Sequence, residues 1–400
     1  HKMYSGPPIA AIPGIQTKEI SGFMNQVNTP TADFQIAPYI EELEIVAQRG
    51  HKDPSTENLL LALLEIYHEY RELIEEFIAL VLLRAMQQQL EITPRAFRLS
   101  LLTSVKLYLR TRDIKDYEFF AVDMWKQVVL ECLTRIDEEF ANDCLRDVST
   151  VKIYRYAALQ ILGGILNHAR PVFPKGLRIV DGGCSINIGL KCLNELRIFQ
   201  DIECSPEILQ VLGGKLITFP LQYACGIDKY PPNLERTLAS LFPSEVKFWE
   251  ALYTKLYYLS KKKIEYHQQD ILYLAQHQEY EKAFDLVFLS SLLRRFPPRQ
   301  VAEVLVQVDY MTGDHSFLVI NEHNSKETIE GGGAYATFIV PKDGLKRIIQ
   351  QFREKIDLYQ LLNMAWQVFV YPDENCQKVF AGKHLKTFLQ HYTALSGLIA

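Results

Sequence analysis

From residue 177 onward, short apolar segments typical of β-strands alternate with longer segments of helical periodicity, such as Pro231–Leu241, Pro298–Met311 and Lys342–Ile356. Strands joined by helical crossovers form parallel sheets with helices on both faces. The alternation therefore predicts an α/β fold with a doubly wound, mostly parallel, seven-stranded sheet. The segment PDENCQ, between the last two strand candidates, permits an antiparallel hairpin and no helical crossover. The strand candidates are Leu177–Asp181, Tyr223–Asp228, Ile264–His267, Phe284–Ser290, Ser316–Glu322, Trp366–Tyr371 and Lys378–Ala381.

The segment before this region differs, because nearly all of it has helical periodicity. In DPSTENLLLALLEIYHEYRELIEEFIALVLLRAM, apolar residues recur at intervals of three and four. Asp53 or Ser55 can cap the N-terminus of this stretch. Thr93 is the expected cap of a further helix, with Pro94 as its first residue. These features predict a helical region that is distinct from the α/β region.

The boundary between the two regions is predicted at a segment rich in proline and glycine, HARPVFPKG, at residues 168–176. Two more helices are expected before it, at Tyr117–Asn142 and Thr150–His168. We predict an all-helical lid or acceptor-docking domain at residues 1–170 and a ligand-binding core at residues 171–400. In the alternative interpretation, the helices form a bundle whose apolar stripes serve only its own core.

Composition excludes several classes of protein. The 400 residues carry a formal net charge of −5, and a dedicated nucleic-acid binder would usually show a strong basic excess. None of the seven cysteines has C-x-x-C spacing, so neither a zinc site nor a disulfide framework is indicated. The apolar run at residues 77–83 is far too short to span a bilayer. We therefore predict a cytoplasmic protein with no nucleic-acid partner, no membrane partner and no metal.

The first strand candidate ends in the stretch RIVDGGCSINIG, which predicts a ligand-binding turn. In doubly wound sheets, ligands bind at the carboxyl ends of the strands, where the strand order reverses. Gly182 and Gly183 would let a ligand approach the backbone closely. The pattern is Asp181-x-Gly183-x-Ser185-x-Asn187 and not the G-x-G-x-x-G of dinucleotide enzymes. Because Asp181 would repel a pyrophosphate and attract an ammonium group, the turn suits an amino-acid-like ligand bearing a ribose.

Further polar residues follow the next strand candidates. Asp228 ends the second one, where a carboxylate can accept hydrogen bonds from both ribose hydroxyls, and Lys229 follows it. Asp270 is suited to accept from an adenine amino group, with the backbone N–H of Ile271 facing the ring. Ser290, at the end of the fourth strand candidate, completes the predicted set. The alternative is that the aspartates only cap helices or occupy turns.

Taken in order, these segments resemble the class I S-adenosylmethionine-dependent methyltransferases. FDLVFLSSLLRRFPPRQVAEVL and GDHSFLVINE are close to the fourth and fifth strand regions of that family, and the resemblance covers roughly residues 150–400. It implies a Rossmann-like core with S-adenosylmethionine as cofactor and S-adenosylhomocysteine as product. Ser185 and Asn187 depart from the glycine pattern of the family. Relative to the family, there is an apparent insertion between the first two strands, ELRIFQDIECSPEILQVLGGKLITFPLQ. It could shift the register of the second strand and so the position of Asp228.

Candidate catalytic residues lie just beyond the fifth strand candidate. His323 and Asn324 follow Glu322, at positions that face the methyl donor in the fold that the resemblance implies. His323 could deprotonate the acceptor, and Asn324 could hold an oxygen. Tyr335 lies behind a glycine loop at residues 331–333, which could gate the site. The alternative is that His323 is a surface residue and that the loop is a plain turn.

The large helical region suggests a bulky or carrier-borne acceptor. A helical half before such a core resembles the C-methyltransferase domains of bacterial polyketide synthases, whose substrate is an acyl thioester on an acyl carrier protein. The resemblance implies an acyl carrier protein or neighbouring synthase domains as partners. Basic residues at 261–263, 294, 295 and 299 could meet an acidic carrier.

The chain departs from those domains after the fourth strand candidate, where SLLRRF lacks their catalytic histidine. The base must then come from elsewhere, or the carbanion must form by loss of CO₂. Three alternatives remain open. They are a free-standing O- or N-methyltransferase of secondary metabolism, a non-catalytic cofactor-binding scaffold, and a metal-assisted enzyme that uses His323.

Overall fold

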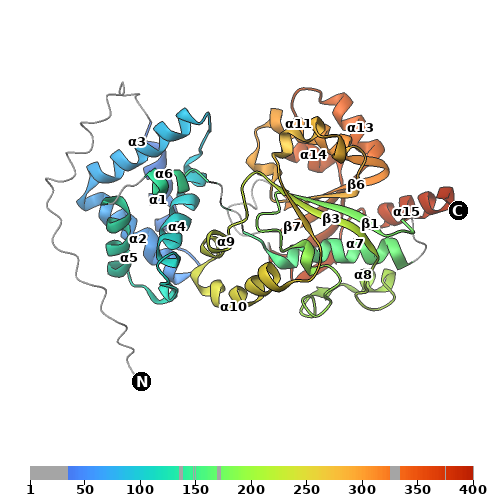
Figure 1. The fold of residues 1–400 in the computed structure, drawn as a ribbon, viewed down its shortest axis with the longest axis horizontal. Coiled ribbons are helices and arrows are strands. Elements are labelled where there is room, and N and C mark those ends of the chain that lie inside the picture. The colour runs from blue at the N-terminus through green and yellow to red at the C-terminus, as the bar shows by residue number, and fades with distance from the viewer. Residues whose placement is uncertain are drawn as a thin grey trace, which may run out of the picture. The chain divides into compact units, whose positions relative to one another are not determined.

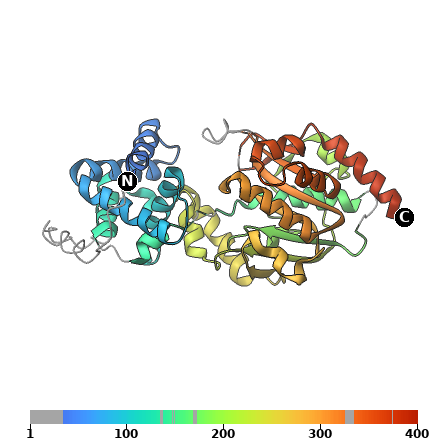
Figure 2. The ribbon, with the colours of Figure 1, turned by 90° about the horizontal axis from the view of Figure 1, so that it is seen from above.

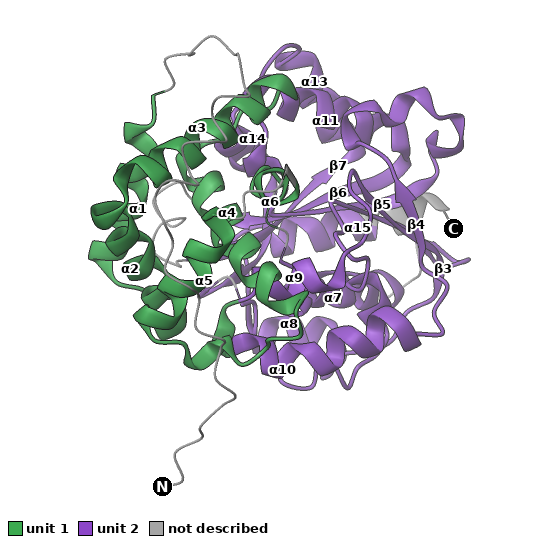
Figure 3. Ribbon diagram, turned by 60° about the vertical axis from the view of Figure 1, so that its left-hand side comes forward, with its two compact units in different colours: residues 1–148, 242–244 green, residues 149–241, 245–400 purple. Residues whose placement is uncertain are grey.

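The computed structural model describes residues 35–134, 138–146, 148, 150–168, 173–324, 334–373 and 375–399. The chain divides into two compact units, residues 1–148 with 242–244 and residues 149–241 with 245–400 (Figure 3). Residues 149–170, which the sequence placed with the helical domain, thus belong to the second unit. The reason is that the side chains of residues 157–166 are apolar almost all round and form part of the core beneath the sheet.

All regular secondary structure in the described part of the first unit is helical, as the periodicity predicts (Figure 1). The side chain of Asp53 accepts a hydrogen bond from the Thr56 N–H at 2.8 Å, and Thr93 caps the helix that begins at Pro94. The long apolar stretch after Asp53 forms two helices that meet at Tyr70. The elements are α1 (Ala37–Arg49), α2 (Pro54–Glu69), α3 (Arg71–Gln87), α4 (Pro94–Arg110), η3 (Tyr117–Phe119), α5 (Val122–Thr134) and α6 (Glu138–Asp143).

The second unit has the predicted doubly wound α/β fold, but its described residues form a sheet of nine strands where the sequence indicated seven. The order is β2-β9-β8-β7-β6-β5-β1-β3-β4. The strands are β1 (Leu177–Gly182), β2 (Glu203–Cys204), β3 (Leu221–Asp228), β4 (Glu265–Gln268), β5 (Phe284–Ser290), β6 (Thr312–His323), β7 (Tyr335–Pro341), β8 (Trp366–Tyr371) and β9 (Lys378–Ala381).

The two additional strands are β2 and β7. The β2 strand is only two residues long and pairs in parallel with β9. The β7 segment, YATFIVP, is buried on both faces, so it is apolar except for Thr337 and shows no apolar–polar alternation. It follows the predicted glycine loop at residues 331–333, which lies outside the described residues, and sequence analysis did not include the segment among the strand candidates.

One side of the described sheet is a continuous parallel block, and the pattern changes beyond β6. β4, β3, β1, β5 and β6 form the parallel part. β7 runs antiparallel to both β6 and β8, and β8 and β9 form the predicted antiparallel hairpin. The chain proceeds from β1 to β3 and β4 on one side and then returns to β5 on the other side. The strand order therefore reverses at β1, and the carboxyl ends of β1, β3 and β5 flank the switch point where ligands bind in such sheets.

Helices cover both faces of this sheet (Figure 1). One face packs on α7 (Ala157–His168), α8 (Pro206–Val211), α9 (Leu234–Ser240), α10 (Pro243–Thr254) and α15 (Leu385–Ile399). The other face packs on α11 (Pro298–Met311), α13 (Lys342–Gln351) and α14 (Leu358–Met364), and α11 contacts α13 (Figure 2). No helix in the described part of the chain has the length and apolar character needed to cross a membrane.

Short helical turns complete the second unit. Several of them follow strands directly, at the edge of the sheet where the candidate site lies. They are η4 (Ile153–Tyr156), η5 (Leu190–Cys192), η6 (Lys255–Leu259), η7 (Ile271–Gln276), η8 (Gln278–Tyr280) and η9 (Leu293–Arg295).

Candidate functional site

The turn after β1 contains three left-handed residues at alternate positions. Gly183, Ser185 and Asn187 have φ angles of 77°, 56° and 55°. This region is easy for glycine, tolerated by asparagine and unfavourable for serine. The spacing in the sequence thus reflects a real backbone requirement, and the turn keeps its conformation although two of the three positions carry side chains.

Asp228, at the end of β3, holds this turn in place. Its Oδ2 accepts a hydrogen bond from the Ser185 N–H at 2.8 Å, and its Oδ1 accepts one from the Tyr230 N–H at 3.2 Å. Burial raises the pKa of Asp228, and the backbone donors oppose that shift by favouring the carboxylate. The predicted ribose-binding carboxylate therefore lies beside the turn, so the insertion before β3 has not moved Asp228 away from it.

Asn187, which was predicted to contact the cofactor, has its side chain against β3 and β4 instead. Its side-chain amide donates to the Glu265 carbonyl at 2.9 Å, which ties the turn to β4. The Asn187 side chain is 4% exposed. A Cβ atom on Gly226 would lie 2.2 Å from its Oδ1, so the amide packs closely against the β3 backbone. The structure thus gives Asn187 a role in holding strands and turn together.

Asp270 lies just beyond the end of β4, before η7. Its Oδ1 accepts a hydrogen bond from the Leu272 N–H at 3.0 Å and so caps η7, which the sequence left open as an alternative. Its Oδ2 lies 3.8 Å from the Lys229 ammonium. Ile271 is 7% exposed and points into the apolar core. A Cβ atom on Gly182 would lie 2.8 Å from Ile271 and 2.7 Å from Leu289, so the lack of a side chain at Gly182 makes room for packing and not for a ligand.

Asp181 is enclosed by the protein. It is 1% exposed, and its Oδ2 accepts a hydrogen bond from the Tyr156 hydroxyl at 2.5 Å. Burial and the Asp228 charge raise the pKa of Asp181 to about 7, against the effect of that hydrogen bond. The Tyr156 ring lies on the backbone of Gly189, where a Cβ atom would come within 1.8 Å of it. The predicted contact of Asp181 with a ligand ammonium therefore requires Tyr156 to move.

A second polar cluster lies at the carboxyl ends of β5 and β6. Glu322 is fully buried, and its Oε1 lies 3.6 Å from Nη1 of Arg294. Burial raises the pKa of Glu322, while Arg294 and Arg155 act to lower it. The Arg155 guanidinium donates to the Ser291 hydroxyl at 2.8 Å and lies 4.7 Å from the centre of the Tyr335 ring. The cluster therefore places a buried acid, Glu322, near one buried and one half-buried arginine.

Two of the three predicted catalytic residues, His323 and Tyr335, lie in this cluster, whereas Asn324 contacts β8. His323 is 2% exposed, and its ring meets the Tyr335 ring edge-on with centres 5.2 Å apart. The Tyr335 hydroxyl lies 2.5 Å from that of Ser291, and burial raises the pKa of Tyr335 to about 12. Asn324 instead accepts a hydrogen bond from Gln367 on β8 at 2.7 Å. The structure thus brings His323 and Tyr335 together and directs Asn324 away from them.

Sequence analysis missed Arg155, Tyr156 and Ser291. Arg155 and Tyr156 lie on η4, more than a hundred residues before β5 and β6, and no local pattern in VKIYRYAALQ marks them as site residues. Ser290, which the sequence did select, has a buried hydroxyl with no hydrogen-bond partner in the described part of the chain. Among the described residues, no group of three or more His, Cys, Asp or Glu side chains could hold a metal ion.

Comparisons with known proteins give the following matches. No family model and no curated protein matches the chain. Phosphoethanolamine N-methyltransferase 2 of Haemonchus contortus, solved with phosphomonomethylethanolamine and S-adenosylhomocysteine, is 14% identical, with 52% of this chain and 35% of that chain covered and a TM-score of 0.26. The N-methyltransferase NodS of Bradyrhizobium japonicum is 15% identical, with coverages of 50% and 74% and a TM-score of 0.26.

A third solved structure, an S-adenosylmethionine-dependent methyltransferase of Mesorhizobium loti, is 19% identical, with 43% of this chain and 54% of that chain covered and a TM-score of 0.23. This chain thus spans about half the length of that protein and about a third of the H. contortus enzyme. Because these TM-scores are far below 0.5, we base the function on the residues of this chain.

Proposed function

We propose that this chain transfers a methyl group from S-adenosylmethionine to an acceptor. The observation that carries the proposal is the position of Asp228 and Asp270 at the carboxyl ends of the neighbouring strands β3 and β4, beside the left-handed turn after β1. Carboxylates at such strand ends can accept hydrogen bonds from the hydroxyls and the amino group of a nucleoside.

The side chains present fit this cofactor in part. Each carboxylate oxygen has two acceptor positions, so Asp228 can hold the turn and still accept from ribose hydroxyls. The hydroxyl of Ser290, which has no partner within the described residues, is a further polar group at the same edge. Asp181 fits only after Tyr156 has moved, because the carboxylate is buried and already accepts the Tyr156 hydroxyl.

The bound cofactor would supply a methyl group on a sulfonium, which is already strongly electrophilic. The protein then has to align the acceptor and exclude water. His323, beside Tyr335, is the group suited to take a proton from an oxygen or carbon acceptor. The buried Arg155 and the half-buried Arg294 could balance negative charge that develops near Glu322.

For the acceptor, we propose carbon of an acyl thioester on an acyl carrier protein, with deprotonation or CO₂ loss providing the nucleophile. The support is the size of the first unit together with exposed basic residues of the second, Lys261, Lys263 and Arg299. Two other basic residues are engaged within the protein, since Arg294 pairs with Glu322 and Lys262 lies 3.1 Å from Glu195. A free-standing O- or N-methyltransferase is the alternative.

One observation favours a second candidate function, a cofactor-binding scaffold without turnover. The two acids nearest the β1 turn already have protein partners, because Asp181 accepts from Tyr156 and Asp228 accepts from two backbone N–H groups. Such a site could bind the cofactor weakly and lack the alignment that transfer requires. Binding without methylation of any acceptor would support this candidate.

Calorimetry tests the cofactor. S-adenosylmethionine and S-adenosylhomocysteine should bind, whereas NAD should not. Asp228→Ala removes a charged acceptor of two hydrogen bonds and should weaken binding by about 1.5–3 kcal/mol. The matched control is Asp314→Ala, an exposed aspartate near the opposite end of β6, which should leave binding unchanged. Equal affinity of the Asp228→Ala variant and the native chain would mean that another acid holds the ribose.

Intact-protein mass spectrometry tests the acceptor. Acyl groups on a carrier protein should gain the mass of a methyl group, while the same acyl groups as free acids should not. Added salt should raise the KM for the carrier, because it screens the attraction between exposed charges. Equal turnover of the free acids would reject the carrier and favour the small-molecule alternative.

A further inference from the structure

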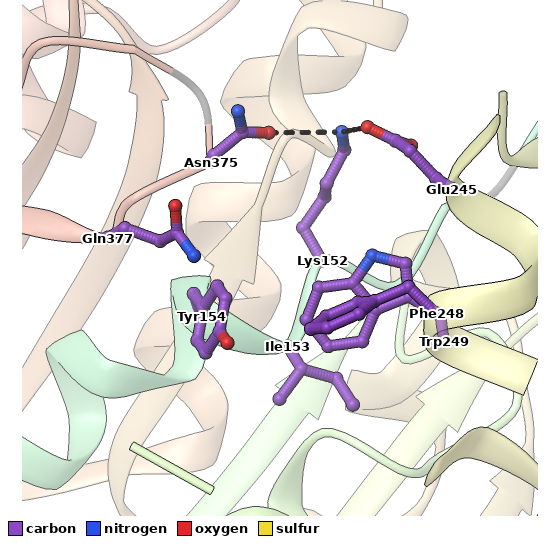
Figure 4. A pocket seen from close by; sticks show the side chains of 8 residues that line it. All are labelled: Lys152, Ile153, Tyr154, Glu245, Phe248, Trp249, Asn375 and Gln377. Atoms are coloured by element: carbon purple, nitrogen blue, oxygen red, sulfur yellow. Dashed lines mark hydrogen bonds and ion pairs between the residues drawn. The ribbon is translucent and has the colours of Figure 1, made fainter. Parts of the chain in front are cut away.

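The second unit contains an aromatic pocket that none of the strand-end carboxylates enters (Figure 4). Its volume is about 180 Å³. The walls come from η4 and the residue before it, from α10, and from Asn375 and Gln377 just before β9, three parts of the chain that are far apart in sequence. A dry cavity of about 150 Å³ is enough to hold benzene, so this pocket has room for one six-membered ring with a small substituent.

Three aromatic rings form the apolar part of the pocket. The Phe248 and Trp249 rings meet at 85° with centres 4.8 Å apart, and the Tyr154 and Trp249 rings meet at 70° with centres 5.3 Å apart. Steep edge-to-face arrangements of this kind are favourable for a further aromatic ring as well. Phe248 is 67% exposed, a large apolar area that a ligand would cover.

Polar groups gather at one rim of the pocket. The Lys152 ammonium lies 3.4 Å from the Asn375 side-chain oxygen and 3.9 Å from a Glu245 carboxylate oxygen, and Figure 4 shows it between the two. The Asn375 oxygen accepts from Lys152, which leaves its NH₂ group as a donor for a ligand. Ammonium and amide N–H groups together present donors, and they suit an anionic oxygen.

We propose that this pocket binds a single-ring aromatic carboxylate. The ring lies against Phe248, Trp249 and Tyr154, and the carboxylate accepts from Lys152 and from the Asn375 amide. Glu245 acts against this ligand, because its charge offsets that of Lys152. The proposal does not depend on methyl transfer, since it uses no residue assigned to the cofactor or to the acceptor.

The pocket adjoins the strand ends through η4. Ile153 and Tyr154 line the pocket, whereas the next two residues, Arg155 and Tyr156, contact Ser291 and Asp181. A ligand in the pocket would thus contact the same short turn that covers the end of β1. The pocket is nevertheless a separate site, because its polar groups are Lys152, Glu245 and two amides of the β8–β9 segment.

The test is a titration of the full chain with benzoate, benzylamine and cyclohexanecarboxylate, followed by tryptophan fluorescence and ligand-observed NMR. Benzoate should bind with a Kd of about 0.1–10 mM, the range that a ligand of this size reaches without an enclosed site. Benzylamine carries the opposite charge and cyclohexanecarboxylate lacks the aromatic ring, so both should bind at least about fivefold more weakly.

Variants at the rim test whether positive charge strengthens and negative charge weakens the binding of benzoate. Lys152→Met should weaken benzoate binding by about tenfold or more, and Glu245→Gln should strengthen it by about two- to fivefold. Trp249→Phe should abolish the fluorescence change while the NMR signal of binding remains, whereas Trp366→Phe should preserve both. Tighter binding of benzylamine than of benzoate, or unchanged benzoate affinity in Lys152→Met with native stability, would overturn the proposal.

Discussion

The carboxyl ends of the strands form one edge of the sheet, with a half at β1 and β3 and a half at β5 and β6. The acidic side chains of the two halves have different partners. At β1 and β3, Asp181 and Asp228 accept hydrogen bonds from neutral donors, a tyrosine hydroxyl and backbone N–H groups. At β6, Glu322 is buried together with cations, since Arg294 lies 3.6 Å away and Arg155 also lowers its pKa. Burial raises the pKa of the carboxyl group in both halves; at Asp181 a neutral hydroxyl opposes that rise, whereas at Glu322 two arginines oppose it.

This difference suggests a division of labour between the halves. The β1–β3 half has a turn of left-handed residues and acceptor oxygens, which suits binding of a neutral or cationic ligand. The β5–β6 half contains His323, Tyr335 and buried charges, which suits proton transfer and stabilisation of developing charge. The following predictions test the comparison, beginning with the largest expected effect.

If the β6 half carries the chemistry, His323→Ala should lower kcat by about 10²–10⁴, the usual contribution of a general base. Cofactor affinity should hardly change, because His323 would contact the acceptor. The matched control is His315→Ala, an exposed histidine near the other end of the same strand. Steady-state kinetics on the true acceptor measures both, and near-normal turnover of the His323→Ala variant would remove this histidine from the mechanism.

If cations hold the β6 half together, Arg155→Met should reduce the free energy of unfolding by about 3–5 kcal/mol. The substitution deletes a buried charge that balances Glu322 and a charged hydrogen bond to Ser291. Arg155→Lys keeps the charge and should cost clearly less. Urea denaturation measures both, and a loss below about 1 kcal/mol for Arg155→Met would show that Arg294 alone compensates Glu322.

The β1 half should respond to pH through Asp181. Its pKa is raised to about 7 in the folded chain, so its favourable contribution is complete below the unfolded pKa of about 4 and is lost as pH rises from there through 7. Asp181→Asn removes this titration and should gain about 2–4 kcal/mol of stability relative to the native chain between pH 4 and pH 8.

Tyr156→Phe provides the companion measurement for Asp181. The Tyr156 hydroxyl favours the ionised carboxylate, so its loss should raise the pKa of Asp181 further and extend the pH-dependent loss of stability to higher pH. Denaturation midpoints across this pH range test both variants. A constant difference between Asp181→Asn and the native chain at every pH would show that Asp181 does not titrate there.

The smallest expected effect concerns the contact that covers Asp181. Gly189→Ala places a Cβ atom within 1.8 Å of the Tyr156 ring, which must shift and weaken its hydrogen bond to Asp181. We expect a loss of about 1–3 kcal/mol. In Gly313→Ala the new atom would lie 3.7 Å from its nearest neighbour, so this control should stay within about 0.5 kcal/mol of the native chain. Equal midpoints for the two variants would contradict the close packing of Tyr156.

Several features of fold and site could be predicted because their causes are local. The alternation of strand and helix segments predicts the doubly wound core, and the caps at Asp53 and Thr93 lie where their sequences place them. The prediction of a PDENCQ hairpin is confirmed by the antiparallel pairing of β8 and β9. The strand count was wrong because β2 is too short to produce a pattern and because β7, buried on both faces, shows no apolar–polar alternation.

The sequence by itself determined the class of the fold and the positions of acids at the ends of β1, β3, β4 and β6, since backbone periodicity and turn chemistry are properties of neighbouring residues. Only the tertiary structure decided which partners those acids have. Tyr156 covers Asp181, Arg294 pairs with Glu322, and the rings of η4 and α10 meet around one pocket. Contacts of this kind depend on strand order and on how helices pack across the sheet, and residues far apart in the chain carry no local signal of them.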